Sequence, residues 1–349
     1  MSEPRRGRSA LSMLTRARVL EFVREPEAIF WVFAFPVLMA LVLGFAFRDR
    51  PPDPLPVGVV AGPSAGSLSA ALAKSSGVRP VPFATREEGL AALRIGKIAL
   101  LVEEAPDLVY RFDPTRPDAR LARLEADDAI QRSRGRRDPA APKEALVHEK
   151  GSRYIDFLVP GILGLNLMGT GIWGIGFSIV NARLKKTLKL MVATPMRKSD
   201  YLFAQILSRF VFLVLEVAVI LVFGVFVFGV PVRGSVALVL FVAFLGALSF
   251  AGLGLLVVAR AQTLEAASGL MNLVMVPMWL VSGVFFSAER FPKATQPLIH
   301  ALPLTALNDA LRAVMLEGKG VPAIGRELAV LVLWGAISFA AALKIFRWQ

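Results

Sequence analysis

The chain has 349 residues, of which 55% are hydrophobic and only 19% are charged, and its formal net charge is +13. Because a soluble protein usually carries about a quarter charged residues, this composition is typical of an integral membrane protein, and we interpret the positive charge as a signal for membrane orientation and not for nucleic-acid binding. The sequence has no cysteine and only two histidines, His148 and His300, which excludes disulfides, thiolate metal sites and cysteine nucleophiles and disfavours a histidine-rich metal site.

Six apolar segments are long enough to cross a membrane as helices, since a spanning helix needs about 20 apolar residues. They run over residues 29–47, 154–180, 201–230, 235–259, 266–286 and 328–346. One span therefore precedes a polar region, residues 48–153, and five spans follow it within residues 154–349. This pattern predicts an α-helical polytopic membrane protein with six transmembrane helices in a 1 + 5 arrangement.

Lys and Arg residues in short loops indicate the cytoplasmic side of a membrane protein. They are frequent in the N-terminal arm, residues 1–28, and in the loop 181–200, whereas residues 231–234 contain a single arginine. This predicts that both termini and the loop 181–200 are cytoplasmic, and that the regions 48–153, 231–234 and 288–326 lie outside. The arm alternates apolar residues with arginines at helical spacing, which is typical of an amphipathic helix along the interface; a frayed tail is the alternative.

The polar region 48–153 alternates predicted strands and helices. Strands are expected at residues 57–60, 79–83, 98–102 and 108–112, and helices at 67–74, 86–94 and 118–131. Strands that alternate with helices predict a small α/β domain with a partly parallel sheet. Its place after the first span makes this domain extracytoplasmic in the predicted orientation.

No complete motif for nucleotide or zinc chemistry occurs in the sequence. A phosphate-binding P-loop needs Gly-Lys followed by Ser or Thr, but neither Gly96-Lys97 nor Gly318-Lys319 is followed by one. His148 begins a segment like a zinc-protease helix, but Ser152 stands where the second histidine belongs. We therefore expect no catalytic residues and no metal site in this chain.

Two groups of short motifs follow one another along the second half of the chain. The first group contains YIDFLVPG at 154–161 and LKLMVATP at 188–195, and the second contains SGVFF at 282–286, LPLT at 302–305 and DALR at 309–312. In order and spacing, and together with the 1 + 5 layout, they resemble the permease subunits of ABC-2-type (type V) ATP-binding-cassette exporters. The chain departs from that pattern at Asn181-Ala182 and Lys186, where the family often has an acidic residue and a glycine.

The resemblance implies a function and partners. It implies a permease subunit of an ATP-driven exporter in the bacterial plasma (inner) membrane, which forms the translocation path as a homodimer or with a related permease. Separate cytoplasmic ATPase subunits would bind ATP and Mg²⁺, so this chain itself would need no cofactor. Membrane lipid would surround it, no nucleic acid would bind, and the exported substrate is not identified by the sequence.

The resemblance also implies a role for the basic loop 181–200, which is similar to the family's coupling helix. This helix presses into a groove on the ATPase. The residues expected to make that contact are Arg183, Leu184, Lys185, Lys186, Leu188, Thr194 and Pro195. From the residues alone, the same loop is equally well a positively charged membrane anchor.

Three polar residues lie within predicted spans. Glu216 is near the middle of the third span, where an ionisable group is costly. Arg209 lies seven residues earlier, and because seven helical residues span about 10 Å, we expect no direct pairing along the helix. Glu216 is instead expected to pair across helices or to stay protonated, at the dimer interface or beside the translocation path; a structural hydrogen bond is the alternative. Asn166 and Asn272 are assigned to the same intramembrane group, with interhelical hydrogen bonds as their default use.

Residues 291–320 contain too many prolines to cross the membrane completely. They predict short external or re-entrant helices before the last span. We expect Pro303, Asp309 and Arg312 to belong to an outer lid that Asp309 and Arg312 brace; a plain surface loop is the alternative.

Two further functional readings stay open at this point. The first is a membrane receptor or sensor that binds a ligand with its external α/β domain. The second is a secondary transporter or channel in which Glu216 is a proton or ion site, although the six spans show no obvious inverted repeat.

Overall fold

The structure, a computed structural model, describes residues 15–16, 19–20, 22–47, 53–104, 107–137, 151–186 and 198–345, with side chains from Ser208 onwards in the last range. The chain divides into two compact units, one formed by residues 49–147 and the other by the segments on either side of them. Within the described residues, six helices are long and apolar enough to cross a membrane, which confirms the predicted number of spans.

The first span is a composite helix with a π turn. It consists of α2 (Pro26–Ile29), the π-helical turn η1 (Phe30–Ala34) and α3 (Phe35–Ala46). At the end of η1, the amide of Phe35 donates to the carbonyl of Phe30, five residues earlier. Beyond this wide turn, α3 buries Pro36, Ala40 and Gly44, which lie four residues apart on one side of the helix.

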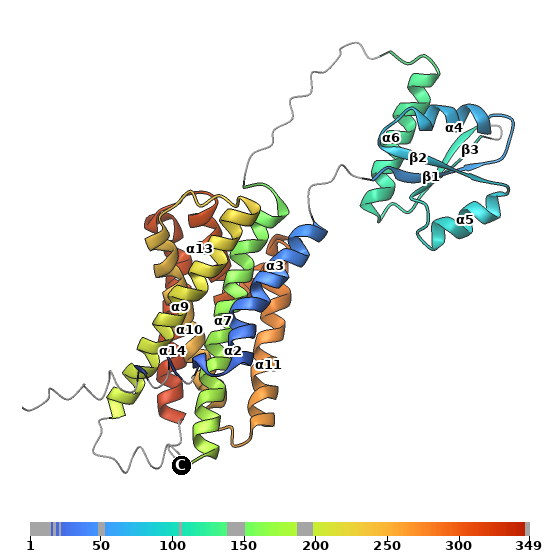
Figure 1. The fold of residues 1–349 in the computed structure, drawn as a ribbon. Coiled ribbons are helices and arrows are strands. Elements are labelled where there is room, and N and C mark those ends of the chain that lie inside the picture. Colours follow the sequence, from blue (N-terminus) through green and yellow to red (C-terminus); the bar gives the residue numbers. More distant parts are fainter. Residues whose placement is uncertain are drawn as a thin grey trace, which may run out of the picture. The chain divides into compact units, whose positions relative to one another are not determined.

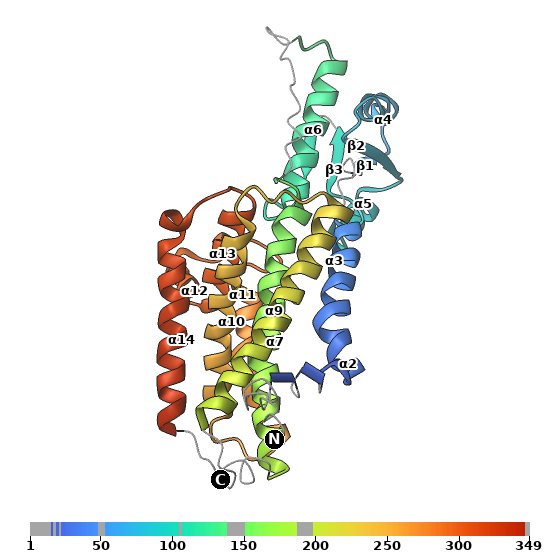
Figure 2. The same ribbon diagram turned by 60° about the vertical axis from the view of Figure 1, so that its left-hand side comes forward.

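The other five spans include the central helix of the bundle. They are α7 (Tyr154–Leu184), α9 (Lys198–Phe228), α10 (Val236–Val258), α11 (Leu264–Val281) and α14 (Gly325–Ile345). The central helix is α7, which packs against α3, α9, α10 and α11 and runs through the length of the bundle (Figures 1 and 2). Its glycines permit this packing: a Cβ on Gly171 would lie only 2.7 Å from the Cβ of Phe250 on α10.

Short helices connect α11 to α14. They are η2 (Ala288–Arg290), η3 (Lys293–Thr295), α12 (Gln296–His300), α13 (Pro303–Met315) and η4 (Val321–Ile324). The longest, α13, packs against α7, α10 and α14, and it buries Leu304, Leu307 and Leu311 completely. The alternative of a plain surface loop is therefore wrong, because this amphipathic helix belongs to the core of the bundle unit.

The second unit is a four-stranded α/β domain. Its strands are β1 (Leu55–Val60), β2 (Val78–Phe83), β3 (Leu100–Glu104) and β4 (Leu108–Arg111), in the order β2-β1-β3-β4. The strand β1 pairs in parallel with β2 and β3, and β4 is antiparallel to β3. The sheet is thus partly parallel, as the alternation of strands and helices predicted.

Helices cover the sheet on both faces. They are α4 (Ala65–Ala73), α5 (Arg86–Arg94) and α6 (Pro117–Ser133). Residues of α4 and α6 share one apolar cluster with Val57 and Val59 of β1, and α5 contributes to a separate cluster with Leu101 of β3. Burial from both sides explains why β1 is a continuous apolar run, LPVGVV, and does not alternate with polar residues.

Candidate functional site: a buried polar network in the helix bundle

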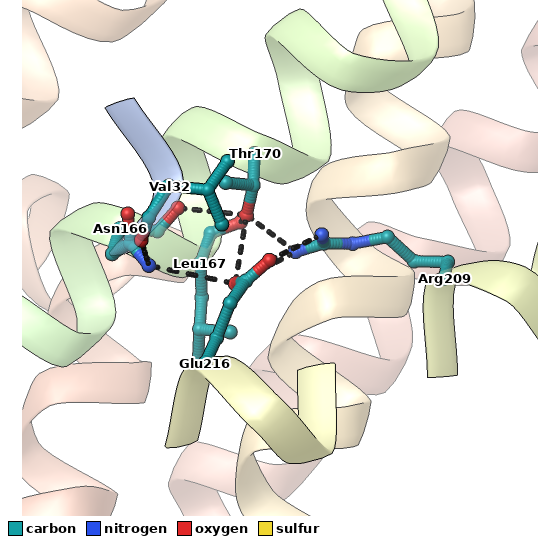
Figure 3. A network of polar contacts seen from close by, with 6 residues as sticks. All are labelled: Val32, Asn166, Leu167, Thr170, Arg209 and Glu216. Carbon is teal, nitrogen blue, oxygen red and sulfur yellow. Dashed lines mark hydrogen bonds and ion pairs between the residues drawn. The ribbon is translucent and has the colours of Figure 1, made fainter. Parts of the chain in front are cut away.

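A network of polar side chains lies inside the bundle, between the first three spans. Figure 3 shows its members: Asn166 and Thr170 from α7, Arg209 and Glu216 from α9, and the backbone carbonyl of Val32 in the π turn η1. The surrounding residues are apolar, so each polar group in this position needs a partner within the protein.

The centre of the network is an ion pair between Glu216 and Arg209. The Arg209 Nη1 lies 2.7 Å from Glu216 Oε1, and Nη2 lies 3.3 Å from Oε2. Glu216 is only 1% exposed, and the side chain of Arg209 is 17% exposed. The expectation that these residues do not pair along the helix is therefore wrong.

The reason lies in helix geometry. Two residues seven apart lie on the same side of a helix, because 3.6 residues make one turn. The rise between them is about 10 Å, and two long side chains that lean towards each other cover that distance. The predicted rise of about 10 Å was correct. It does not prevent pairing, because the reach of the two side chains decides whether their charged groups meet.

Side chains of α7 complete the shell around the carboxylate. Thr170 Oγ1 lies 3.1 Å from Glu216 Oε2 and 2.8 Å from the carbonyl of Asn166, and it also accepts from Arg209. A hydroxyl has one proton, so Thr170 donates to one of these two oxygens at a time. Asn166 Nδ2 donates to the Val32 carbonyl at 3.2 Å and approaches Glu216 Oε2 at 3.5 Å.

The arrangement joins three spans and is electrically neutral. Both carboxylate oxygens of Glu216 already have donors from Arg209, and Oε2 has further neighbours on α7. Removing one partner of a buried ion pair strongly destabilises a protein, because the other charge is left uncompensated. The network can hold α7, α9 and η1 in register, and its acceptors are occupied by donors of the protein itself.

Asn272 lies elsewhere. It is exposed on α11, on the same helix as the exposed apolar residues Leu273 and Leu280. The structure therefore separates it from Asn166 and Glu216, with which the sequence grouped it. Among the described residues, no group of three or more His, Asp or Glu side chains is placed to hold a metal ion.

Of the residues expected in the outer lid, Asp309 and Arg312 lie together near the end of α13, and Pro303 lies at its beginning. Arg312 Nη2 donates to the carbonyls of Gly283, at 2.5 Å, and Phe157, at 3.2 Å, and its guanidinium carbon lies 3.6 Å from the centre of the Phe157 ring. Asp309 lies 3.9 Å from Arg312. Pro303 is the first residue of α13, where its missing N–H costs nothing.

Burial shifts the protonation of this pair. Desolvation raises the pKa of Asp309 above its usual range, and it lowers the pKa of Arg312 to about 10, so Arg312 stays charged at neutral pH. A charged guanidinium with two backbone acceptors fastens α13 to the beginning of α7 and to the residues after α11.

The expected ATPase-coupling residues divide into three groups. Leu184, Lys185 and Lys186 are exposed at the end of α7, whereas Arg183 turns towards the bundle and donates to the carbonyls of Val258, Ala259 and Ala261. Leu188, Thr194 and Pro195 lie outside the described residues.

The ion pair between Arg153 and Asp156 was not predicted from the sequence. At the other end of α7, Arg153 pairs with the buried carboxylate of Asp156 at 2.8 Å, and the same Nη2 lies 3.0 Å from the carbonyl of Phe228, the last residue of α9. The only available signal was a carboxylate in the first turn of an apolar helix, a position that favours capping. The partner on α9 is 75 residues away in the sequence.

Comparison with known proteins places this bundle among transporters. The family described as "ABC-2 type transporter" matches residues 125–316, which cover α7 to α13 and more than half of the chain. The chain is 28% identical over 172 residues to "ABC transporter G family member 20" of Dictyostelium discoideum, which covers 49% of this chain and 23% of that protein.

Two bacterial relatives match at a similar level. One is the "Probable multidrug ABC transporter permease YbhS" of Escherichia coli (strain K12), 25% identical over 187 residues, or 52% of this chain and 48% of the relative. The other is the "Linearmycin resistance permease protein LnrN" of Bacillus subtilis (strain 168), 26% identical over 211 residues, or 60% of this chain and 54% of the relative. The matches thus span about half the length of the bacterial relatives and a quarter of the larger one. The match to the family over most of the helix bundle shows that the chain belongs to the ABC-2 type transporter family.

Proposed function

We propose that this chain is the permease subunit of an ATP-driven exporter in the bacterial inner membrane, powered by separate ATPase subunits that bind ATP and Mg²⁺. The observation that carries this proposal is the family match over residues 125–316, which includes the central helix α7 and the basic loop that follows it. In this proposal both termini and that loop are cytoplasmic, and the α/β domain and α13 lie outside.

The helix α7 connects the two sides of the membrane. It has 31 residues, and at 1.5 Å per residue it is about 46 Å long, enough to cross a bilayer with both ends in the interfaces. Its proposed cytoplasmic end carries Lys185 and Lys186, exposed and close to the loop proposed to contact the ATPase. A displacement of that end is therefore passed along a single helix to its outer end.

The buried network gives α7 a fixed relation to its neighbours. Because Glu216 and Arg209 on α9 bond to Thr170 on α7, and Asn166 bonds to η1, we propose that these three spans move as one body during transport. This assigns Glu216 a positioning role. It disfavours the reading of Glu216 as a proton or ion site, because Arg209 already neutralises the carboxylate.

A second permease copy is proposed to cover α11. This helix exposes Asn272 beside Leu273, which is 71% exposed, and Leu280. A polar amide that faces lipid lacks partners, whereas an amide between two helices can form an interhelical hydrogen bond. The partner is a second copy of this chain or a related permease.

The names of two relatives support a proposal for the substrate class. They refer to multidrug transport and linearmycin resistance. We propose an amphipathic, drug-like molecule, since a path between apolar helices accepts apolar groups and a few polar residues suffice to orient them.

The test is transport in inverted membrane vesicles that contain this chain with its co-purified ATPase. We expect uptake of an amphipathic dye on addition of ATP, and no uptake when the P-loop lysine of the ATPase is replaced by alanine. Uptake that persists without ATP but stops when the proton gradient is dissipated would instead support a secondary transporter. A chain that binds a ligand through its α/β domain but moves none would support a receptor.

A further inference from the structure

Arg183 is the most buried member of the basic group at the end of α7. Its Nη1 lies 3.3 Å from the carbonyl of Val258, its Nη2 lies 3.2 Å from that of Ala259, and Nη1 also bonds to the carbonyl of Ala261. These acceptors belong to the last turn of α10 and to the short connection that leads into α11 at Leu264.

The physical reason for this contact is the end of a helix. The last four carbonyls of a helix have no partner within it, and they carry the negative end of the helix dipole. A guanidinium has several N–H groups in one plane, so a single arginine can bond to neighbouring carbonyls that point in different directions. Arg183 therefore caps α10 from the neighbouring helix α7.

The residues next to Arg183 and next to its acceptors are exposed. Leu184, Lys185 and Lys186 are exposed, as are Arg260 and Gln262 in the connection from α10 to α11. The surface that an ATPase can reach is thus formed by other residues, and Arg183 lies behind it. Its contacts join that surface to the ends of two further spans.

We propose that Arg183 is a positioning residue that holds the end of α7 and the α10–α11 connection together as one cytoplasmic unit. A displacement that the ATPase imposes on α7 then moves the beginning of α11 at the same time. This inference rests on the proposed function, and it places Arg183 inside the permease and not in the contact with the ATPase. It also links the driven helix α7 to α11, the helix with the exposed face.

The experiment uses the absence of cysteine from the sequence. Lys185→Cys and Gln262→Cys are introduced together and carry nitroxide labels, and the labelled chain is placed in nanodiscs with its co-purified ATPase. The dipolar coupling between the labels is measured without nucleotide and after trapping with ATP and vanadate. With Arg183 present, we expect the same coupling in both states.

The variant Arg183→Gln removes the guanidinium and its hydrogen bonds to the carbonyls of Val258, Ala259 and Ala261. We expect its dipolar coupling to be weaker and more broadly distributed, above all in the trapped state, while the amount of bound ATPase is unchanged. Arg260→Gln is the matched control, because it removes an exposed arginine from the same connection and should behave as the parent. Arg183→Lys keeps the charge but has one nitrogen in place of three, and we expect an intermediate loss.

Several outcomes overturn the inference. Unchanged coupling in Arg183→Gln shows that these hydrogen bonds do not hold the end of α7 and the α10–α11 connection together. If the glutamine variant does not assemble, unchanged coupling in Arg183→Lys shows the same. Loss of the ATPase from Arg183→Gln with unchanged label coupling makes Arg183 a direct contact, which overturns this inference and leaves the proposed function intact. If no ATPase co-purifies with the parent chain and ATP drives no dye uptake into vesicles that contain it, the proposed function fails and the inference fails with it.

Discussion

The helices α7 and α11 are both spans of the same bundle, but the chain covers them very differently. In the most apolar part of α7, 78% of the residues are buried within the chain, against 22% in α11. One glycine on each helix shows the same difference: a Cβ on Gly171 of α7 would lie 2.7 Å from the Cβ of Phe250, whereas a Cβ on Gly269 of α11 would meet nothing within 4 Å. α7 is therefore stabilised by its own chain, and α11 presents a surface to lipid or to another subunit.

The difference in burial between α7 and α11 determines where substitutions should act. On α7 and its polar partners they should change the stability of the single chain, because contacts are lost within it. On α11 they should leave the single chain unchanged and act on association. The following predictions, in order of expected size, test this division.

The largest effect is expected when the ion pair next to α7 is broken. Glu216→Ala leaves the charge of Arg209 within the bundle without a counter-charge, which costs about 3–5 kcal/mol. Thermal unfolding of the purified chain in detergent measures this loss. The double variant Arg209→Leu, Glu216→Leu should regain most of it, and a double variant as unstable as the single one would show that the charge is not the cause.

A smaller effect is expected where Arg312 of α13 joins the beginning of α7 to the residues that follow α11. Arg312→Gln removes charged hydrogen bonds to the carbonyls of Phe157 and Gly283, which costs about 1.5–3 kcal/mol. The same unfolding measurement applies, with Arg290→Gln, an exposed arginine of η2, as the control. Equal stability of the two variants would contradict the assigned role of Arg312.

Alanine substitutions of Gly171 on α7 and Gly269 on α11 test directly whether the two helices differ in packing. In Gly171→Ala the new Cβ meets the Cβ of Phe250 at 2.7 Å, so α7 and α10 must move apart, at a cost of about 1–3 kcal/mol. Gly269→Ala adds the same group to α11 where nothing lies within 4 Å, and alanine favours a helix over glycine. If both variants lose stability equally, the difference between the two helices does not reside in their packing.

The smallest effect is expected at Asn272. Asn272→Leu removes one interhelical hydrogen bond at the proposed subunit contact, worth about 0.6 kcal/mol, and should leave the unfolding of the single chain unchanged. Energy transfer between donor- and acceptor-labelled chains in nanodiscs reports the association. A loss of single-chain stability without a loss of association would place Asn272 within the fold of one copy.

Hydropathy alone predicted the spans, since each crosses the hydrocarbon as a run of apolar residues. The α/β alternation likewise followed from the local pattern, for which a strand such as LPVGVV is a sufficient signal. The burial of α13 did not follow, because its amphipathic sequence is compatible with a surface helix and with one wedged between α7, α10 and α14.

The candidate site was predictable only in part. The cost of a carboxylate in the membrane singled out Glu216, but its partners depend on rotamers and on which sides of α7 and α9 meet. The same limit applies to the backbone carbonyls that Arg183 and Arg153 bind, which lie 75 residues or more away in the sequence. Carbonyls occur at every residue, so the sequence carries no mark of the one that a given arginine selects.

The π turn η1 has a consequence for insertions and deletions. It closes its turn with a hydrogen bond over five residues, so it holds one residue more than the α-helical turn that it replaces. Removing one residue from Phe30–Ala34 should therefore restore regular winding and keep Pro36, Ala40 and Gly44 on the side that packs against the bundle. Removing one residue from Val37–Met39, where regular α-helix has no extra residue to lose, should instead rotate the rest of α3 by about 100° about its axis. A cysteine introduced at position 40 should then become reactive towards a lipid-soluble maleimide in the second deletion variant and stay shielded in the first.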